Sequence, residues 1–281
     1  MKQKLFVSFS AGQSSGYMCY LILLHWMGLY EVIFILANTS QEREESLIFA
    51  DKCDKFFGLN LVWIEAVINK ERGVGTGFKV VNFETACRDG SIFEDMIEFY
   101  GIPNTSYPHC TRELKEVPMH KYAKTVWPDG DYLTALGIRV DEEGRVGSNP
   151  KITYPLNDPF MKDKIDVNNF WESQPFKLEL LSHQGNCSWC WKKSDKKLHM
   201  LIDESPEIFD FPRRMEAKHG LSGHNIDGTK RTFFRKHRSV DNLFKEHEVI
   251  ASSGRQSSIF DEEESSGCSE SCEPFMGGVE A

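Results

Sequence analysis

The stretch "LFVSFSAGQSSGYMCYLILLHWM" (Leu5–Met27) decides the fold of this chain. Residues 4–9 are mostly apolar and predict a buried strand, and residues 14–28 have the long apolar pattern of a helix. Between them lies a loop of serine, glycine and glutamine. A strand that passes through such a loop into a helix is typical of the first unit of a parallel α/β sheet.

The same alternation continues along the chain. Residues 31–39, 59–68 and 131–140 are rich in apolar residues and predict further strands, and residues 40–58 have helical spacing. Strands that alternate with helices in this way are joined by right-handed crossovers in a parallel sheet. We therefore predict an α/β fold, a Rossmann-like parallel sheet flanked by helices.

Beyond this region the pattern changes. From residue 158 the alternation is lost, and tryptophan, cysteine and charged residues dominate. We predict an α/β domain over residues 1–157, a cysteine-bearing C-terminal lobe over 158–250, and an acidic, serine-rich tail over 251–281. Trp171, Trp189 and Trp191 are expected to pack around the cysteines of the lobe.

Composition restricts the partners. The formal net charge of −9 argues against broad electrostatic binding to duplex nucleic acid. The run "KRTFFRKHRS" (residues 230–239) is strongly basic, and we interpret it first as a solvated face and second as a nucleic-acid contact. No apolar run has transmembrane length, and the N-terminus has no signal-peptide cleavage pattern, so we expect a cytoplasmic protein with no membrane partner.

The loop "SFSAGQSSG" (residues 8–16) is suited to an anion. It precedes a helix, whose first backbone N–H groups and dipole face any anion placed there. Small residues allow close approach, and the serine hydroxyls add donors. The loop has neither the G-x-G-x-x-G pattern of a dinucleotide site nor the G-K-[ST] ending of a P-loop. A plain helix N-cap is the alternative interpretation.

Five motifs together resemble the phosphoadenosine phosphosulfate (PAPS) reductase family of the adenine nucleotide α-hydrolase (N-type ATP pyrophosphatase) superfamily, notably its members from bacteriophage genomes. They are "SFSAGQSS" (8–15), "NTSQEREES" (38–46), "LGIRVDEEGR" (136–145), "YPLNDP" with "DVNNFW" (154–159 and 166–171), and "GNCSWCWKKSDKKL" (185–198). The first resembles the S-G-G-x-x-S pyrophosphate loop. Ala11 replaces the first glycine of that motif, and Ser14 stands where ATP pyrophosphatases commonly have aspartate. The second change weakens the expectation of Mg²⁺-assisted ATP cleavage.

The resemblance implies that the first domain binds an adenine nucleotide, either PAPS, adenosine phosphosulfate (APS) or ATP, the last with Mg²⁺. An arginine pair after the strand at residues 131–140 suits bidentate contact with phosphate or sulfate. The expected nucleotide-binding residues are Ser8, Ser10, Ala11, Gly12, Gln13, Ser14, Ser15, Asn38, Thr39, Gly137, Arg139, Glu142 and Arg145.

The cysteines predict a metal site. Cys187 and Cys190 form a C-x-x-C pair, which can hold one metal from a single turn. A single cysteine far upstream, Cys110, resembles the iron–sulfur pattern of APS-type reductases, in which two cysteines are adjacent at that position. Cys272 is the expected fourth ligand, with Cys268 and His109 as alternatives. We expect a 4Fe–4S cluster, with zinc on the same thiols as the alternative.

Cys268 and Cys272 are also the expected catalytic cysteines, together with Arg139. The related reductases carry a nucleophilic cysteine in a C-terminal E-C-G-[IL]-H motif. This chain has "GCSESCEPF" (267–275) instead, with acidic neighbours that disfavour a thiolate.

The sequence therefore predicts an enzyme of sulfur chemistry, for which two reactions stay open. One is reduction of PAPS or APS, which needs a thiol reductant protein as partner. The other is ATP-dependent adenylation followed by sulfur transfer to a nucleic acid or nucleotide. A homodimer is compatible with both. The rival hypothesis is a nucleotide-binding or interaction protein without catalysis, stabilised by a structural zinc ion.

Overall fold

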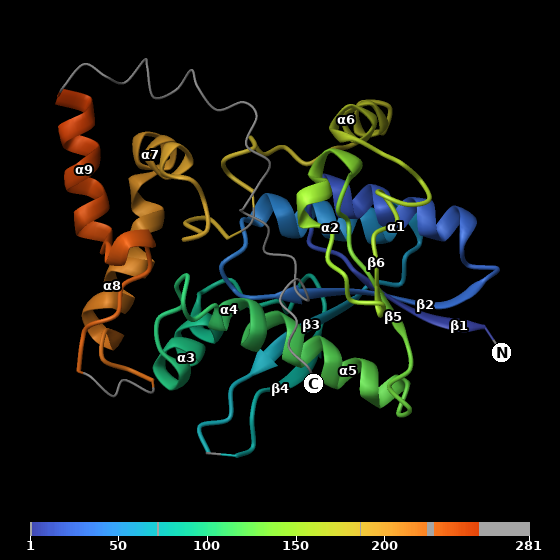
Figure 1. The fold of residues 1–281 in the computed structure, drawn as a ribbon, viewed down its shortest axis with the longest axis horizontal. Helices are drawn as coiled ribbons and strands as arrows, with labels where there is room; N and C mark the ends of the chain where they lie inside the picture. Colours follow the sequence, from blue (N-terminus) through green and yellow to red (C-terminus); the bar gives the residue numbers. More distant parts are fainter. Residues whose placement is uncertain (1, 72, 186, 224–227, 253–281) are drawn as a thin grey trace.

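The structure, a computed structural model, describes residues 2–71, 73–185, 187–223 and 228–252. Its centre is a mixed sheet with the strand order β4-β3-β2-β1-β5-β6 (Figure 1). The strands are β1 (Gln3–Ser8), β2 (Tyr30–Asn38), β3 (Val62–Val67), β4 (Gly77–Val81), β5 (Leu133–Ala135) and β6 (Ile152–Thr153). All pairs are parallel except β3 with β4. The predicted α/β fold is confirmed, with an antiparallel strand at one edge.

Helices cover both faces of the sheet. Figure 1 shows α1, α2 and α6 on one face and α5 on the other. Their bounds are Gln13–His25 for α1, Glu44–Phe57 for α2, Lys164–Glu172 for α6 and Val117–Val126 for α5. Leu5 and Val7 of β1 pack into the core under α1, whereas Phe6 between them packs with Met119 of α5. The central strands are therefore buried on both faces, which explains their continuous apolar sequence.

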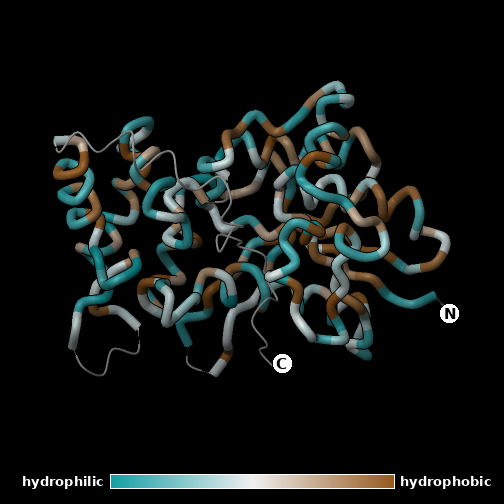
Figure 2. The backbone as a smooth tube through the Cα atoms, turned by 45° about the horizontal axis from the view of Figure 1, so that its top comes forward, coloured by the Kyte–Doolittle hydropathy of each residue, from teal (hydrophilic) through white to brown (hydrophobic). Residues whose placement is uncertain are grey.

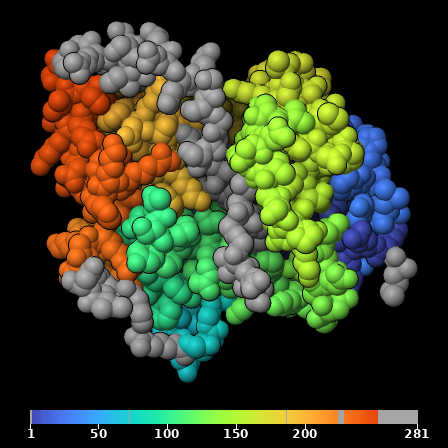
Figure 3. All heavy atoms as spheres, viewed as in Figure 1, coloured from blue at the N-terminus to red at the C-terminus, as the bar shows by residue number. Residues whose placement is uncertain are grey.

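The remaining helices gather beside the sheet. They are α3 (Ser91–Tyr100), α4 (His109–Thr111), α7 (Asp195–Glu204), α8 (Asp210–His219) and α9 (Val240–Ser252), with a π-helical segment η1 (Arg112–Glu116) and short 3₁₀ segments η2 (Val140–Arg145), η3 (Pro206–Phe209) and η4 (Arg235–His237). In the space-filling view the C-terminal helices adjoin the teal and green segment that contains α3 and α4 (Figure 3). Trp189, Phe209 and Phe233 form a separate apolar core with α3.

The residues after position 158 contribute to both cores. Trp171 of α6 lies in the sheet core, where its indole Nε1 donates to the carbonyl of Gln13 at 2.9 Å. A Cβ on Gly16 would lie 2.9 Å from the Trp171 ring, so the glycine is required for this packing. The expectation that Trp171 packs beside the cysteines is therefore wrong. The division of the chain at residue 158 stays a prediction.

The last predicted strand is shorter than expected. Only Leu133–Ala135 of the predicted range 131–140 is a strand, because the chain turns after it and the Ile138 amide donates to Leu136 O at 3.0 Å. This turn carries the following residues toward the start of α1.

Figure 2, in which the backbone is coloured by residue hydropathy, shows hydrophobic residues in the middle of the sheet region. Among the described helices, none combines the length and apolar character needed to span a bilayer.

Candidate functional site

The loop between β1 and α1 is organised by Ser15. Its hydroxyl oxygen accepts from the Ser10 amide at 3.2 Å, lies 2.9 Å from the Ser10 hydroxyl and donates to the Gly12 carbonyl at 3.0 Å. These bonds close the loop into a compact turn at the N-terminus of α1. The first N–H groups of a helix lack intrahelical partners, so the turn presents donors at the carboxyl edge of the sheet.

Two small residues make this loop possible. Ala11 has a φ of 56°, in the left-handed region that favours glycine. The S-G-G-x-x-S motif, which this loop resembles, has glycine at that position. Gly137, from the turn after β5, lies against the loop: a Cβ on it would be 2.9 Å from Ser15 Cα. Backbone from two distant parts of the sequence is therefore in direct contact at this point.

Two arginines follow Gly137 and border the loop. Arg139 Nη1 donates to the Ser14 hydroxyl at 2.9 Å, and its Nε pairs with Asp141 at 2.9 Å. The hydrogen bond from Arg139 lowers the pKa of the Asp141 carboxyl. Arg145 pairs with Glu142, which also pairs with Arg139. One buried carboxylate thus holds both guanidinium groups beside the serine loop.

These groups open onto a cavity of about 270 Å³, here called the phosphate-loop cavity. Its lining includes the serine loop, Gly137 and both arginines, together with the apolar side chains of Val167, Leu178, Leu180 and Leu181. A cavity that combines convergent polar groups with apolar side chains suits a ligand that has a charged part and a flat apolar part. Of the predicted nucleotide-binding residues, those that line it are Ser10, Gly12, Gln13, Ser14, Ser15, Gly137, Arg139, Glu142 and Arg145.

Of the other four predicted nucleotide-binding residues, Ala11 is buried within the loop, and the remaining three lie elsewhere. Ser8 is buried at the end of β1, and its hydroxyl has no hydrogen-bond partner among the described residues. Asn38 is buried at the end of β2, where its amide nitrogen donates to Glu65 at 2.6 Å and to the Cys87 carbonyl at 2.8 Å. Thr39 lines a second cavity, described next.

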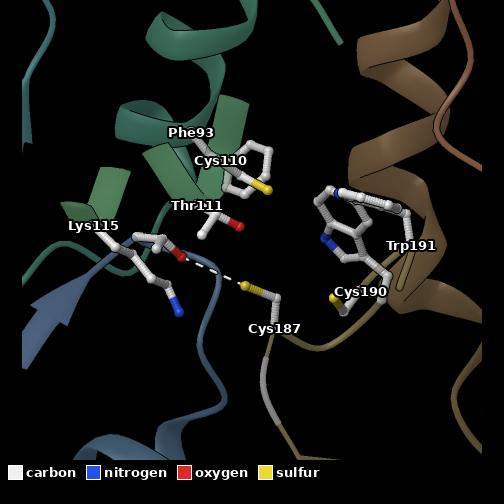
Figure 4. Close-up of a pocket in the computed structure, with 9 residues that line it drawn as sticks. Phe93, Cys110, Thr111, Lys115, Cys187, Cys190 and Trp191 are labelled. Atoms are coloured by element: carbon white, nitrogen blue, oxygen red, sulfur yellow. Dashed lines mark hydrogen bonds between the residues drawn. The ribbon is translucent and has the colours of Figure 1, made fainter. Parts of the chain in front are cut away.

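Cys110, Cys187 and Cys190 line this second cavity, the cysteine cavity, together with Lys115 and Thr39. Figure 4 shows Cys110 approaching from α4 and Cys187 from the opposite side. The structure thus brings together three of the four predicted metal ligands. Cys268 and Cys272, predicted as catalytic residues and the latter also as a ligand, lie outside the described residues.

Three thiols around one space are the donor set that iron–sulfur clusters and structural zinc both use. The cavity itself measures about 10 Å³, roughly the space of one water molecule. Across the described residues, no three or more His, Cys, Asp or Glu side chains are grouped closely enough to hold a metal ion. The thiols are therefore the ligand type that an iron–sulfur cluster or a zinc ion uses. To bind either group, the three side chains would have to shift.

The segment after β2 holds the C-x-x-C loop in place. Glu42 and Cys187 form an isolated β-bridge, and the Ser188 amide donates to the Gln41 carbonyl at 3.2 Å. The Trp189 indole donates to Gln41 Oε1 at 2.6 Å. Sequence analysis assigns no role to Gln41, although its position just after the carboxyl end of a buried strand is a signal that it borders a site.

Thr39 and Glu42 also reach Cys187. The Thr39 hydroxyl donates to the Glu42 carboxylate at 2.8 Å and lies 3.6 Å from the Cys187 sulfur (Figure 4, dashed). On the other side, Lys115 belongs to the π-helical segment η1, a geometry that is frequent at functional sites. The Lys192 ammonium donates to Thr111 at 3.1 Å and so joins the C-x-x-C segment to α4.

Comparison with known proteins gives one informative similarity. No family model matches the chain. The chain is 30% identical, over 283 residues, to the uncharacterized nin region protein ORF290 of Escherichia phage lambda, and the alignment covers 98% of this chain and 96% of the phage protein. The similarity therefore extends over both cavities.

Proposed function

The chain belongs to the family of the phage lambda nin region protein ORF290, and we propose that it is a PAPS reductase-like enzyme. It binds an adenine nucleotide in the phosphate-loop cavity and acts in sulfur chemistry. The observation that carries the proposal is the convergence of the Ser10–Ser15 loop, the N-terminus of α1 and two arginines on one cavity. That combination is suited to a polyanion such as a phosphate chain.

The remainder of the cavity suits the rest of a nucleotide. Its apolar lining, at Val167, Leu178, Leu180 and Leu181, provides a surface for a flat base. Arg139 is the residue on which we expect affinity to depend most, because it borders the loop through Ser14. A charge-assisted contact of this kind contributes strongly to anion binding.

The cysteine cavity is the proposed sulfur-handling part. Cys110, Cys187 and Cys190, with Cys272 as fourth ligand, would hold a 4Fe–4S cluster, which supplies thiolate-ligated iron for electron or sulfur handling. Lys115 lines the same cavity and would offset the negative charge of the thiolates. Thr39, which follows the end of β2, lines the cysteine cavity. The neighbouring strand β1 leads into the serine loop, so the two cavities lie at the ends of adjacent strands.

Two reactions are consistent with this arrangement. In reduction, the S–O bond between sulfate and nucleotide breaks, sulfite leaves, and two thiols supply the two electrons and form a disulfide. In adenylation, an acceptor oxygen attacks the α-phosphate of ATP and pyrophosphate leaves. A sulfide-level sulfur donor, required as a further substrate, then attacks the activated carbon of the acceptor, a nucleic acid or nucleotide, and AMP leaves with the acceptor oxygen. The first needs a thiol reductant protein as partner, and the second needs Mg²⁺ with the ATP.

Calorimetric titration with ATP and with PAPS tests the nucleotide site. We expect Arg139→Gln to weaken binding of the preferred nucleotide by about tenfold or more. Arg88→Gln is the matched control, because Arg88 makes a similar paired contact with Glu44 outside the cavity. Equal binding by all three proteins would contradict the proposal.

The reaction and the metal are tested separately. Sulfite release from PAPS or APS identifies reduction, and pyrophosphate release from ATP identifies adenylation. Iron and sulfide are measured after anaerobic purification, and we expect Cys110→Ala and Cys187→Ala to lose them. Cys87→Ala is the control, because Cys87 lies outside the cysteine cavity and contacts Asp89. The non-catalytic alternative would be established if the purified protein contained zinc but no iron, bound nucleotide, and released neither sulfite nor pyrophosphate.

A further inference from the structure

A second large cavity is lined in part by the start of α4. Its volume is about 640 Å³, within the range of small-molecule sites. Its walls come from the β3–β4 connection (Gly73 and Gly75), the end of α3 (Tyr100), the segment before α4 (Tyr107), the first residue of α4 (His109) and the basic run (Arg231). We call it the Tyr107 cavity. His109 lines it and the next residue, Cys110, lines the cysteine cavity, so the two cavities are neighbours.

Flat surfaces dominate this cavity. The rings of Tyr107 and His109 are nearly parallel, with centroids 5.9 Å apart and an interplanar angle of 14°. The Arg231 guanidinium lies 4.6 Å from the centroid of the Tyr107 ring. Tyr107 is 48% exposed, so its ring is accessible to a ligand.

The basic run divides into two parts with different roles. Phe233 and Phe234 are buried in the apolar core, and Arg238 is paired with Asp195 and Glu246. These residues serve the fold. Arg231 instead lines the Tyr107 cavity, next to the exposed Lys230. The basic run thus places one guanidinium group, that of Arg231, beside the Tyr107 ring.

The acidic and glycine residues of the cavity are compatible with an anionic, planar ligand. Glu98 also lines the cavity, and its carboxylate pairs with Lys70 at 2.5 Å, which offsets its charge. Gly73 and Gly75 have no side chains, so the wall they form permits close approach of a flat ring.

We propose that the Tyr107 cavity binds an unpaired base of a single-stranded nucleic acid, stacked on the Tyr107–His109–Arg231 group. Aromatic rings and arginine planes are the surfaces on which unpaired bases stack, and nearby cations contact the backbone phosphates. The inference rests on the proposed function in its sulfur-transfer form, for which it names the acceptor. A base in this cavity lies beside the cysteine cavity.

The test measures binding in the absence of ATP, by fluorescence anisotropy of a fluorescein-labelled single-stranded oligonucleotide of mixed sequence, as DNA and as RNA. We expect Tyr107→Ala and Arg231→Gln to weaken binding of the better ligand by about tenfold, because one stacking surface is lost in each. Tyr107→Phe keeps the ring and should bind as the wild type does. The matched control is Arg213→Gln, because Arg213 stacks on Phe244 outside the cavity at 4.8 Å.

Two outcomes would overturn the inference. One is undetectable binding by the wild type. The other is equal affinity of Tyr107→Ala and Tyr107→Phe, which would assign any binding to nonspecific electrostatics. Thermal unfolding of each variant shows whether it is folded, and Tyr107→Phe supplies a folded comparison. If the oligonucleotide test fails, the calorimetric result for Arg139→Gln is unaffected. Failure of the proposed base-binding site is therefore distinguishable from failure of the proposed nucleotide site.

Discussion

The phosphate-loop cavity and the cysteine cavity lie near the ends of neighbouring strands, yet they are assembled differently. The first is built around one continuous segment, Ser10–Ser15, whose hydroxyl and amide groups bond to one another. The second joins two segments far apart in sequence, although its C-x-x-C loop has a local turn in which the Cys190 amide donates to the Cys187 carbonyl at 3.1 Å. Its thiols come from α4 and from the C-x-x-C loop, and the latter is held by hydrogen bonds to Gln41.

The difference shows that one site is shaped mainly by contacts between residues close in sequence, and the other by contacts between distant segments. Hydrogen bonds between residues close in sequence form with little loop-closure entropy, so the serine loop keeps its shape wherever β1 and α1 form. The C-x-x-C loop is positioned by contacts with a segment far away in the sequence. We therefore expect the cysteine cavity to be more sensitive to changes in distant packing, and the phosphate-loop cavity to be sensitive mainly where Gly137 meets it.

The largest effect is expected from Gly137→Ala. The added Cβ would lie 2.9 Å from Ser15 Cα and 3.1 Å from Ser15 N, so backbone must move. We expect loss of nucleotide binding by at least about tenfold and a loss of unfolding free energy of about 3 kcal/mol. Calorimetry and urea unfolding measure the two effects. The iron and sulfide content should stay near that of the wild type.

Gly144→Ala is the matched control for this change. Gly144 lies in the same segment, and a Cβ on it would meet nothing within 4 Å. It should therefore bind nucleotide as the wild type does. If Gly137→Ala also retained full affinity, the close contact between the turn after β5 and the serine loop would have no part in forming the site.

A smaller effect, on the other cavity, is expected from Gln41→Leu. The change leaves the buried indole N–H of Trp189 without its acceptor, at a cost of about 2 kcal/mol. Because this bond holds the C-x-x-C loop, we expect reduced iron and sulfide content, with nucleotide affinity changed less than twofold. Metal analysis and calorimetry test this. Gln174→Leu is the control, because the Gln174 side-chain amide donates to Phe170 and Ser173 on the sheet side, away from the C-x-x-C loop.

The smallest effect concerns the pH dependence of the C-terminal helices. Burial raises the pKa of Glu216 from 4.5 to about 7, although its carboxylate accepts from the amides of Val240 and Phe233. Between these two values the folded state holds a proton that the unfolded chain has released. The stabilising contribution is therefore present at low pH and is lost as the pH rises through 7.

Urea unfolding at pH 6 and pH 8 measures this contribution. From Glu216 alone we expect the free energy of unfolding to be about 1 kcal/mol lower at pH 8 than at pH 6. Glu216→Gln should abolish that part of the difference, whereas the exposed Glu172→Gln on the sheet side should leave it in place. An identical pH difference in Glu216→Gln and the wild type would contradict the assignment.

Much of the fold could be predicted because its signals are local. The apolar runs of β1, β2 and β3, and the helix that begins after the serine loop, follow from short-range pattern and hydrophobic burial. The left-handed conformation of Ala11 could not be predicted, because alanine does not favour it. The short β5 could not either, because the apolar sequence continues past the turn in which the Ile138 amide donates to the Leu136 carbonyl.

By itself, the sequence predicted the order β1, α1, β2, α2 and β3, the serine loop and the types of residue available for thiol and anion chemistry. Only the tertiary structure decided which of these residues meet. It placed Trp171 in the sheet core, Gln41 under the C-x-x-C loop, and Arg231 over Tyr107 in a cavity of its own. The physical reason is that such contacts join segments far apart in sequence, and they form only when two helical layers and a second apolar core pack against the sheet.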